Sequence, residues 1–330
     1  MSHELRIATH LGPFGSGGDR YNLKGYKPAV SAEDRIRQAG QVEGLSGVEL
    51  NFRGLVDEKS APVVKAIVEQ TGLTCVNVSM NVWGDARWGL GSLIHPDAAV
   101  RQEARELITA GMLTAKALGC CLVSLWPGQD GFDYPFEVDY SAMVDHFVSG
   151  VQDCADAVPD VRICIEYKTK EPRSHLLVDT AARTMWLINK INRTNVGVLL
   201  DVGHSFLAGE NVAMSAVLLQ REGLLDLLHF NDNYGEWDWD MIPGSVRFWE
   251  LLELIFWLKE TGYTGWNSID ISAARGDATQ AIQQSVTNIR RLYHLTERLD
   301  RRQLLINLGR MDSTANLKLL SDQVFGALGE

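Results

Sequence analysis

Short apolar runs alternate with longer amphipathic segments along nearly the whole chain. The apolar runs have the length of β-strands, and each is followed by a helix or by a segment long enough to form one. The runs expected as strands are 5–9, 47–52, 74–80, 121–126, 162–168, 196–201, 227–231 and 266–272. The clearest helical segments are 97–118, 138–157, 176–192, 245–261 and 275–298. Eight strands alternating with helices predict a parallel, closed (β/α)8 TIM barrel.

The same pattern bears on domain organisation. The alternative to a barrel is an open, doubly wound sheet, but no G-x-G-x-x-G follows the first expected strand. Residues 1–298 are therefore predicted to form one barrel domain. Residues 299–330 lie beyond the eight repeating units, and their leucine pattern predicts a helical tail that packs on the barrel or on a neighbouring subunit.

Composition and charge exclude several classes of protein. Of the 330 residues, 45% are hydrophobic and 22% are charged, which is typical of a soluble globular protein, and no run approaches the roughly 18 apolar residues of a membrane span. No basic region followed by an apolar stretch opens the chain, so no signal peptide is expected. Five cysteines without a C-x-x-C motif suit a reducing compartment, and a cytoplasmic location is predicted. The net charge of −11 argues against a nucleic-acid or anionic-membrane partner.

Charged side chains and histidines gather where the last four expected strands end. Strand 162–168 finishes with Glu166 and Lys168, which share one face because side chains repeat every two residues along a strand. The remaining groups are Asp201, His204, His229 and Asp270 near strand ends, and Asp238 and Asp240 in the loop after His229. The carboxyl ends of barrel strands form one mouth, where buried carboxylates are costly unless they are paired or bind a metal. Oxygen-rich donors with one or two imidazoles suit Mg²⁺, Mn²⁺ or Co²⁺, so the pattern predicts a site for two divalent cations.

Each of these residues also has an ordinary structural explanation. Asp201 taken alone can be a helix N-cap, and His204 and His229 can be core histidines with satisfied hydrogen bonds. The acids of "DWD" can belong to a solvated turn, and Lys168 can form an ion pair with Glu166. Their joint occurrence at successive strand ends favours a functional site, because caps and turns do not explain it.

Several motifs, taken together, resemble those of the xylose isomerase-like sugar isomerases, a (β/α)8 family that uses two divalent metals. "IEYKTKEPR" matches the E-x-K-x-x-E-P-R signature of that family, "DVGHS" matches its acid-x-x-His step, and "DWD" matches its D-x-D metal pair. "LWPGQDG" and "NVWG" are similar to its aromatic segments after the fourth and third strands. These matches are spread over most of the expected barrel.

The resemblance implies a set of ligands and an activity. The first cation would be held by Glu166, Asp201, His229 and Asp270, and the second by His204, Asp238 and Asp240, with Mn²⁺ expected ahead of Mg²⁺ or Co²⁺. Lys168 would contact the oxygen on carbon 1 of a sugar. The residues expected to take part in catalysis are Lys168, Asp240 and His204, and those expected to contact substrate are Trp126, Trp83, His10 and Asn51. The implied reaction interconverts an aldose and a ketose by a metal-assisted 1,2-hydride shift.

The chain departs from xylose isomerases themselves at two informative positions. His229 stands where those enzymes carry an acid, and here the chain is more similar to rhamnose isomerases. Asn51 stands where they carry the histidine that opens the sugar ring. His10 is then the candidate for ring opening, unless the substrate arrives in its open-chain form.

Other functions on this barrel remain open. A single-metal sugar epimerase, or a lyase that cleaves C-glycosides, would use similar residues and act by proton abstraction. An apurinic-site endonuclease would require more histidine ligands and a basic surface, and a non-catalytic sugar-binding protein would have lost its metal ligands. The expected partner is a small, unphosphorylated sugar, and a homodimer or homotetramer is expected, with neither nucleic acid nor membrane as a partner.

Overall fold

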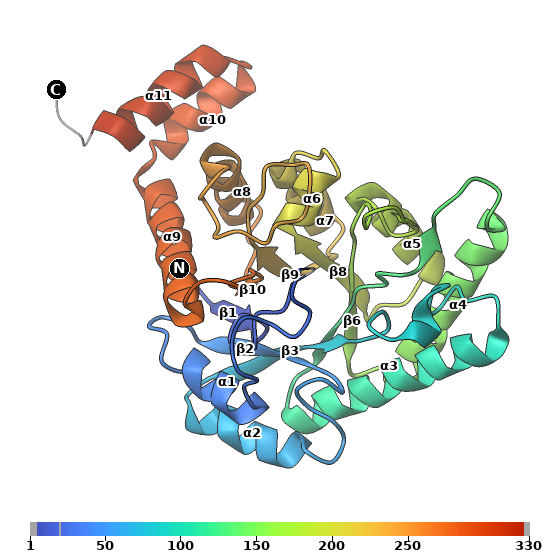
Figure 1. Cartoon of the computed structure of the whole chain (residues 1–330). Coiled ribbons are helices and arrows are strands. Elements are labelled where there is room, and N and C mark those ends of the chain that lie inside the picture. The colour runs from blue at the N-terminus through green and yellow to red at the C-terminus, as the bar shows by residue number, and fades with distance from the viewer. Residues whose placement is uncertain (1–4, 20, 327–330) are drawn as a thin grey trace.

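Eight parallel strands close into a barrel in the computed structural model, which describes residues 5–19 and 21–326. The order around the barrel is β1–β10–β9–β8–β6–β4–β3–β2, and β2 pairs with β1 to complete the ring (Figure 1). The barrel strands are β1 (Ile7–His10), β2 (Gly47–Asn51), β3 (Thr74–Met80), β4 (Leu122–Leu125), β6 (Arg162–Glu166), β8 (Val196–Asp201), β9 (Leu225–Phe230) and β10 (Trp266–Ile269). The predicted (β/α)8 barrel is confirmed.

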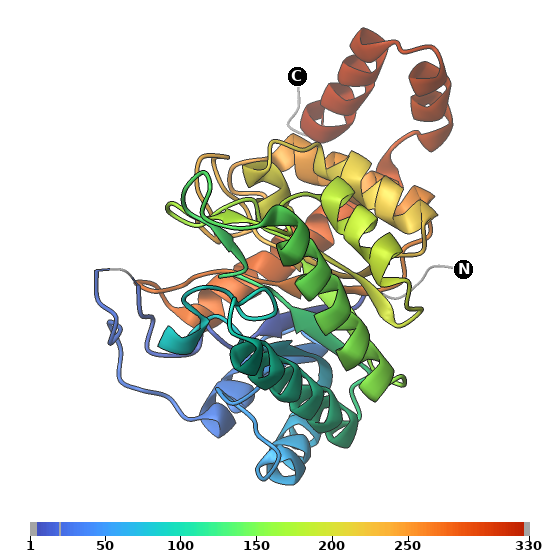
Figure 2. The ribbon, with the colours of Figure 1, turned by 90° about the vertical axis from the view of Figure 1, so that its right-hand side faces the viewer.

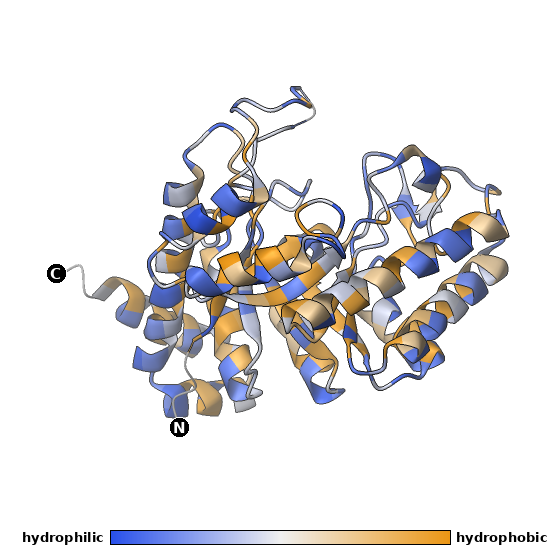
Figure 3. Cartoon of the chain, turned by 90° about the horizontal axis from the view of Figure 1, so that it is seen from below, coloured by the Kyte–Doolittle hydropathy of each residue, from blue (hydrophilic) through white to orange (hydrophobic). Residues whose placement is uncertain are grey.

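Helices surround this barrel and begin at residues that satisfy their free N–H groups. Aspartates or other short polar residues cap most of them; for example, Asp97 accepts from the backbone N of Ala99 at the start of α3. The helices are α1 (Ala32–Ala39), α2 (Ala61–Gln70), α3 (Ala98–Leu118), α4 (Tyr140–Ala157), α5 (Ala181–Ile191), α6 (Val202–Leu207), α7 (Val212–Arg221), α8 (Phe248–Glu260), α9 (Ala278–Arg298), α10 (Arg301–Gly309) and α11 (Ser313–Phe325), with a short 3₁₀ helix η1 (Ala86–Trp88). Figure 3 shows hydrophilic and hydrophobic stripes running along many of them, as expected of helices that cover a core with one side.

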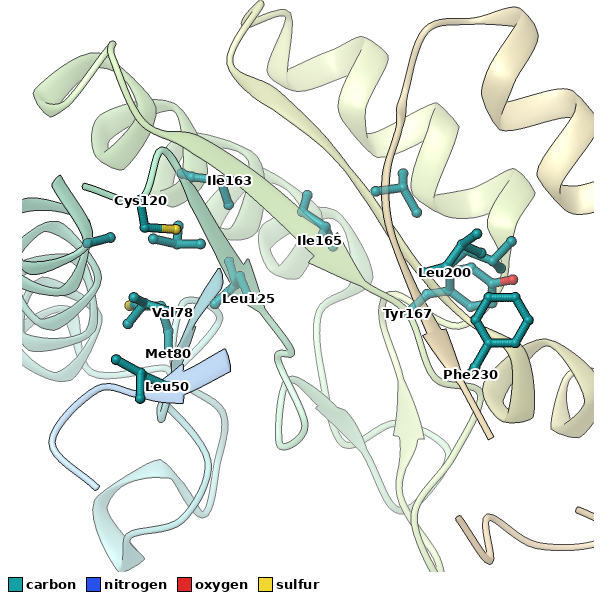
Figure 4. Close-up of a cluster of buried hydrophobic side chains, with 14 of the residues drawn as sticks. Leu50, Val78, Met80, Cys120, Leu125, Ile163, Ile165, Tyr167, Leu200 and Phe230 are labelled. Carbon is teal, nitrogen blue, oxygen red and sulfur yellow. The ribbon is translucent and has the colours of Figure 1, made fainter. Parts of the chain in front are cut away.

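The core lies between the strands and the inner sides of these helices. Val78, Leu125, Ile163 and Ile165 are completely or almost completely buried, and Figure 4 shows them with their neighbours along the strands. Apolar residues on both faces of parallel strands explain why the strands appear in the sequence as nearly continuous hydrophobic runs. The packed core leaves the carboxyl ends of the strands as the place where polar side chains can gather.

One helical segment begins later than its pattern suggests. Residues 176–192 are expected as a helix, but Leu176 pairs with Gly131 in a two-stranded antiparallel sheet of β5 (Gly131–Phe132) and β7 (His175–Leu176). Helix α5 starts only after Thr180, whose side chain accepts from the backbone N of Arg183. The expectation is wrong for 176–180, because pairing with a segment about 45 residues earlier in the chain outweighs the local helical pattern.

The carboxyl-terminal tail is helical, as predicted. Helices α10 and α11 form a hairpin that stands away from the barrel (Figure 2) and touches it through α8. Leu304 packs against Phe256 of α8, and the rings of Trp249 and Phe325 lie 5.9 Å apart. A role in oligomerisation stays a prediction. Within residues 5–19 and 21–326, no helix combines the length and apolarity needed to cross a membrane.

Candidate active site

The end of β6 presents two charged side chains to the mouth of the barrel. Glu166 is buried, and its Oε1 lies 3.5 Å from Nδ1 of both His204 and His229. The Nζ of Lys168 donates to Glu171 Oε1 at 2.5 Å and lies 3.0 Å from Asp238 Oδ2. Burial disfavours the charged ammonium, but these two carboxylates outweigh that effect and raise the pKa of Lys168. Lys168 is therefore a fixed positive charge beside the cluster.

Asp201 combines two roles at the end of β8. Its Oδ1 accepts from the backbone N of His204 at 2.8 Å, which makes Asp201 the N-cap of α6. Both carboxylate oxygens also accept from Nδ2 of Asn231, at 3.1 and 2.9 Å. The same group lies 3.9 Å from Nδ1 of His204 and 3.7 Å from Nδ1 of His229. The structural explanation as a cap is correct, and the cap itself places the carboxylate between two imidazoles.

Helix α6 can start directly on the strand end because residue 203 has no side chain. The carbonyl of Gly203 accepts from Nδ2 of Asn233 at 3.0 Å, and an added Cβ would collide with the amide groups of Asn231 and Asn233. A larger residue would therefore force these two amide groups or the start of α6 to shift.

Glu49 on β2 is a buried acid that the sequence analysis did not single out. His229 Nε2 lies 3.1 and 3.2 Å from its two oxygens, and Asn77 Nδ2 donates to it at 2.6 Å. The hydroxyl of Ser268 donates to the same carboxylate. Burial opposes the charge of Glu49, but His229 and these donors lower its pKa. Because Nε2 of His229 is engaged in this way, Nδ1 is the nitrogen that faces the other carboxylates.

The loop after β9 carries Asp238 and Asp240. Asp238 Oδ2 lies 3.1 Å from Nε2 of His204, and attraction to His204 and Lys168 outweighs burial and lowers the pKa of Asp238. The backbone of Asp240 has φ 45° and its carbonyl accepts from the N of Ser272 at 2.9 Å. The Asp240 carboxyl lines the mouth without a hydrogen bond to the described residues, and burial together with the nearby acids raises its pKa.

Asp270, directly after β10, lies between two histidines. Its Oδ1 is 3.0 Å from His10 Nε2, and its Oδ2 is 3.0 Å from His229 Nδ1 without the geometry of a hydrogen bond. His10 Nε2 is also 3.2 Å from the carbonyl of Ile271, and its Nδ1 accepts from the N of Gly12. His10, the candidate for ring opening, thus has both ring nitrogens in contact with protein atoms.

These groups surround one cavity of about 530 Å³ at the mouth of the barrel. On one wall the rings of Trp83 and Trp126 lie 5.0 Å apart, and Lys168 Nζ is 5.0 Å from the centre of the Trp126 ring. Asn51 lines the same cavity and donates to Ser79 Oγ at 3.1 Å. Every site residue predicted from the sequence lines this cavity except Asp201, which lies behind its wall.

Two groups of side chains have the geometry to hold cations. Within each group the ligand atoms lie within 4.8 Å of one another, and the groups are Glu166, Asp201, His229 and Asp270, and Asp201, His204 and Asp238. Nδ1 of His204 and Nδ1 of His229 are buried and have no hydrogen-bond partner among the described residues. Buried nitrogens without partners beside crowded carboxylates are costly, and a bound cation would stabilise both. The residues fit two divalent cations that share Asp201.

Protonation states within this cluster depend on one another. Burial, with repulsion from Asp238 and Asp270, raises the pKa of Asp201 to about 7. Burial also opposes charge on His204, but attraction to Asp201 and Asp238 prevails and raises its pKa to about 10. Near neutral pH, protons therefore partly balance the clustered charges, and a cation would have to displace them in order to bind.

Comparison with known proteins agrees with this geometry. The family model for the xylose isomerase-like TIM barrel matches residues 36–292. The chain belongs to this family. A probable sugar isomerase of Mesorhizobium japonicum is 26% identical over 306 residues, which cover 88% of this chain and 70% of that protein. A probable sugar isomerase of Rhizobium meliloti is 27% identical over 246 residues, which cover 71% of this chain but only 56% of that relative. The matches thus span 70% and 56% of the lengths of these two xylose isomerase-like relatives.

A solved structure of L-ribulose 3-epimerase superposes on this chain with a TM-score of 0.72. The superposition covers 89% of this chain and 96% of the epimerase at 14% sequence identity, so the likeness is one of fold. A protein described as an epimerase therefore has the same barrel fold as this xylose isomerase-like chain.

Proposed function

We propose that this protein interconverts an aldose and a ketose with the help of two divalent cations. The observation that carries the proposal is the pair of ligand groups joined through Asp201, with the charged Lys168 beside the second group. Family membership and relatives described as sugar isomerases support it.

The residues of the cavity have complementary tasks in this reaction. Glu166, Asp201, His229 and Asp270 would hold one cation, and His204 and Asp238 the other, with Asp240 available beside them. Bound divalent cations would supply Lewis-acid chemistry, polarising the oxygens on carbons 1 and 2 of the open-chain sugar.

Lys168 would stabilise negative charge on the oxygen of carbon 1 while hydrogen moves between carbons 1 and 2. Its ammonium is already oriented by Glu171 and Asp238, so little reorganisation is needed during the reaction. Asp240, once cation binding has displaced its own proton, would accept and return the hydroxyl proton, since its carboxyl faces the cavity without a hydrogen-bond partner among the described residues. Trp83 and Trp126 would exclude water from that side and strengthen these charge interactions.

An isotope experiment tests the hydride route. We expect a panel of free aldoses and ketoses to show turnover with Mn²⁺, Co²⁺ or Mg²⁺ and none with EDTA. An aldose carrying deuterium at carbon 2 should keep most of the label at carbon 1 of the ketose. Wash-out of the label into solvent would exclude the hydride shift.

Substitution of the lysine tests its role separately. Lys168→Met should lower kcat by about 10²- to 10³-fold, the size of the effect of losing one oriented group that stabilises developing charge. Cation content should stay at the wild-type value, and Lys170→Met, two residues further along and outside the cavity lining, should be neutral. Unchanged turnover of Lys168→Met on every active sugar would contradict the proposal.

A single-cation sugar epimerase is the second candidate, favoured by the fold shared with L-ribulose 3-epimerase and by the completeness of the four-residue group around Glu166. It would act by removing and returning a proton at a carbon next to the carbonyl. One cation per chain, together with loss of label from that carbon, would favour the epimerase over the isomerase.

A further inference from the structure

Arg35 is a cation in the cavity wall that forms no ion pair with any acid in the described part of the chain. It lies on α1, whose N-cap is Ser31, and it lines the same cavity as the two ligand groups. Its Nε donates to the carbonyl of Val30 at 3.1 Å. Within residues 5–19 and 21–326, Arg35 forms no ion pair and donates no hydrogen bond from its two Nη atoms.

Two other cations, one in the same cavity and one on the same helix, are paired. Lys168, in the same cavity, contacts the carboxylates of Glu171 and Asp238. Arg37, two residues along α1, forms an exposed ion pair with Glu33 at 2.7 Å. Burial lowers the pKa of Arg35, and no carboxylate offsets that effect. A guanidinium that is partly removed from water without an acidic partner is costly to the protein alone.

The guanidinium is nevertheless held in place. A Cβ added to Gly15 would lie 2.9 Å from Arg35 Cζ and 2.9 Å from Nη1, so the group packs directly on the backbone of the loop between β1 and α1. Together with the bond from Nε to Val30, this contact leaves the two Nη atoms as free donors. An arginine fork of this kind matches the two oxygens of a carboxylate.

We propose that Arg35 binds a carboxylate of the substrate, so that the natural substrate is a sugar acid. The proposal rests on the proposed function, in that a sugar occupies this cavity, and it names the class of that sugar. One monovalent cation matches one carboxylate. A phosphate dianion would call for further positive groups. Besides Arg35, the only lysine or arginine of the cavity lining in the described part of the chain is Lys168, which is already paired, and the lining histidines contact acids.

Binding measurements test the proposal independently of turnover. The probes are matched sugars that differ only at carbon 6: D-glucose, D-galactose and D-mannose, their uronic acids, and their 6-phosphates. Binding to the Mn²⁺-loaded protein is followed by calorimetry and by the fluorescence of Trp83 and Trp126, which line the cavity. At least one uronate should bind about tenfold or more tightly than its neutral parent.

The arginine should account for that preference. Arg35→Gln should weaken uronate binding by about 10- to 100-fold, as expected for loss of a charge-assisted hydrogen bond, and should change neutral-sugar binding by less than about twofold. Arg35→Lys should recover part of the loss, because the charge remains but the fork does not. Arg37→Gln, on the same helix and outside the cavity lining, is the matched control and should behave as wild type.

Three results would overturn the proposal: no uronate binds better than its parent, a 6-phosphate is preferred over the uronate, or Arg35→Gln weakens neutral and acidic sugars equally. The proposed function is tested by label transfer, so the two can fail separately. Turnover of neutral sugars without tighter binding of uronic acids would disprove only the proposed role of Arg35. Arg35-dependent uronate binding without hydride transfer would remove only the isomerase activity.

Discussion

The two halves of the barrel mouth differ in chemistry. Strands β6, β8, β9 and β10 and the segments after them bring the acids and imidazoles of both ligand groups and the ammonium beside them. Both imidazoles have a buried nitrogen without a hydrogen-bond partner in the part of the chain that the structure describes. Strands β2, β3 and β4 present mostly neutral groups to the cavity, where Asn51 Nδ2 donates to Ser79 Oγ. The charged half crowds acids around imidazole nitrogens that have no hydrogen-bond partner among the described residues, whereas the neutral half presents few charged groups to the cavity. The difference suggests that one half binds cations and the other shapes the space for substrate.

The largest effect should come from the residue shared by both ligand groups. Asp201→Asn keeps an oxygen that can cap α6 but removes the charge between the cations, so activity should fall by at least about 10³-fold, since a cation contributes several kcal/mol to the barrier. Metal analysis should find fewer than two cations per chain. Asp97→Asn, which changes an N-cap away from the mouth, is the control. Wild-type cation content in Asp201→Asn would contradict the assignment of cation binding to the charged half.

Glu49 joins the two halves, because it stands on β2 but contacts His229 on β9. All its neighbours donate hydrogen bonds to it, so Glu49→Gln would place an amide N–H against a donor and leave His229 poorly oriented. We expect cation affinity to weaken by about 10- to 100-fold, the usual effect of losing a carboxylate behind a histidine ligand. Calorimetric titration with Mn²⁺ measures this change. Glu33→Gln changes an exposed side chain of α1 and should leave cation affinity unchanged. An equal loss of cation affinity in both variants would disprove the role of Glu49 behind His229.

The charged half should also respond to pH. The folded-state pKa of His204 is raised to about 10, so its imidazole is protonated at pH 7 to 9 and must lose that proton to bind a cation. Cation affinity should rise by about tenfold per pH unit for each proton released, and calorimetric heats should vary with the ionisation enthalpy of the buffer. Without cations, His204 stabilises the fold fully below about pH 6.5, and this stabilisation is lost as pH rises toward 10. Identical heats in all buffers would contradict this coupling.

The smallest effect is expected in the neutral half. Asn51→Ala removes one polar group from the cavity wall, worth about 1 kcal/mol in a hydrogen bond, so KM for the sugar should rise by about fivefold while kcat and cation content are kept. Steady-state kinetics and metal analysis distinguish the two parameters. A fall in kcat with KM unchanged would assign Asn51 to the chemical step. It would contradict the view that the neutral half serves substrate binding alone.

The fold could be predicted from sequence because apolar runs record burial directly. The barrel strands appear as hydrophobic segments, and residues 176–180 were misassigned only because the short pairing of β5 with β7 has no periodic signal. Local pattern predicts an element well when its own core contacts determine it.

The candidate site could be predicted where its residues follow strand ends in order. The contact of Glu49 with the site could not be predicted, because its partner His229 is 180 positions away and only the folded barrel brings the two together. The signal available was an acid within the apolar strand 47–52. Arg35 was missed because its place in the cavity depends on the path of the loop from β1 to α1, which local sequence does not reveal.

The fit of α6 against β9 has an evolutionary consequence. Because the bare backbone at Gly203 is in contact with Asn231 and Asn233, these three positions should covary among homologues, even though none of them belongs to either ligand group. A lineage that exchanges both asparagines for smaller residues would be free to lose the glycine, and the spacing between aspartate and histidine in that turn would then drift without any change in chemistry.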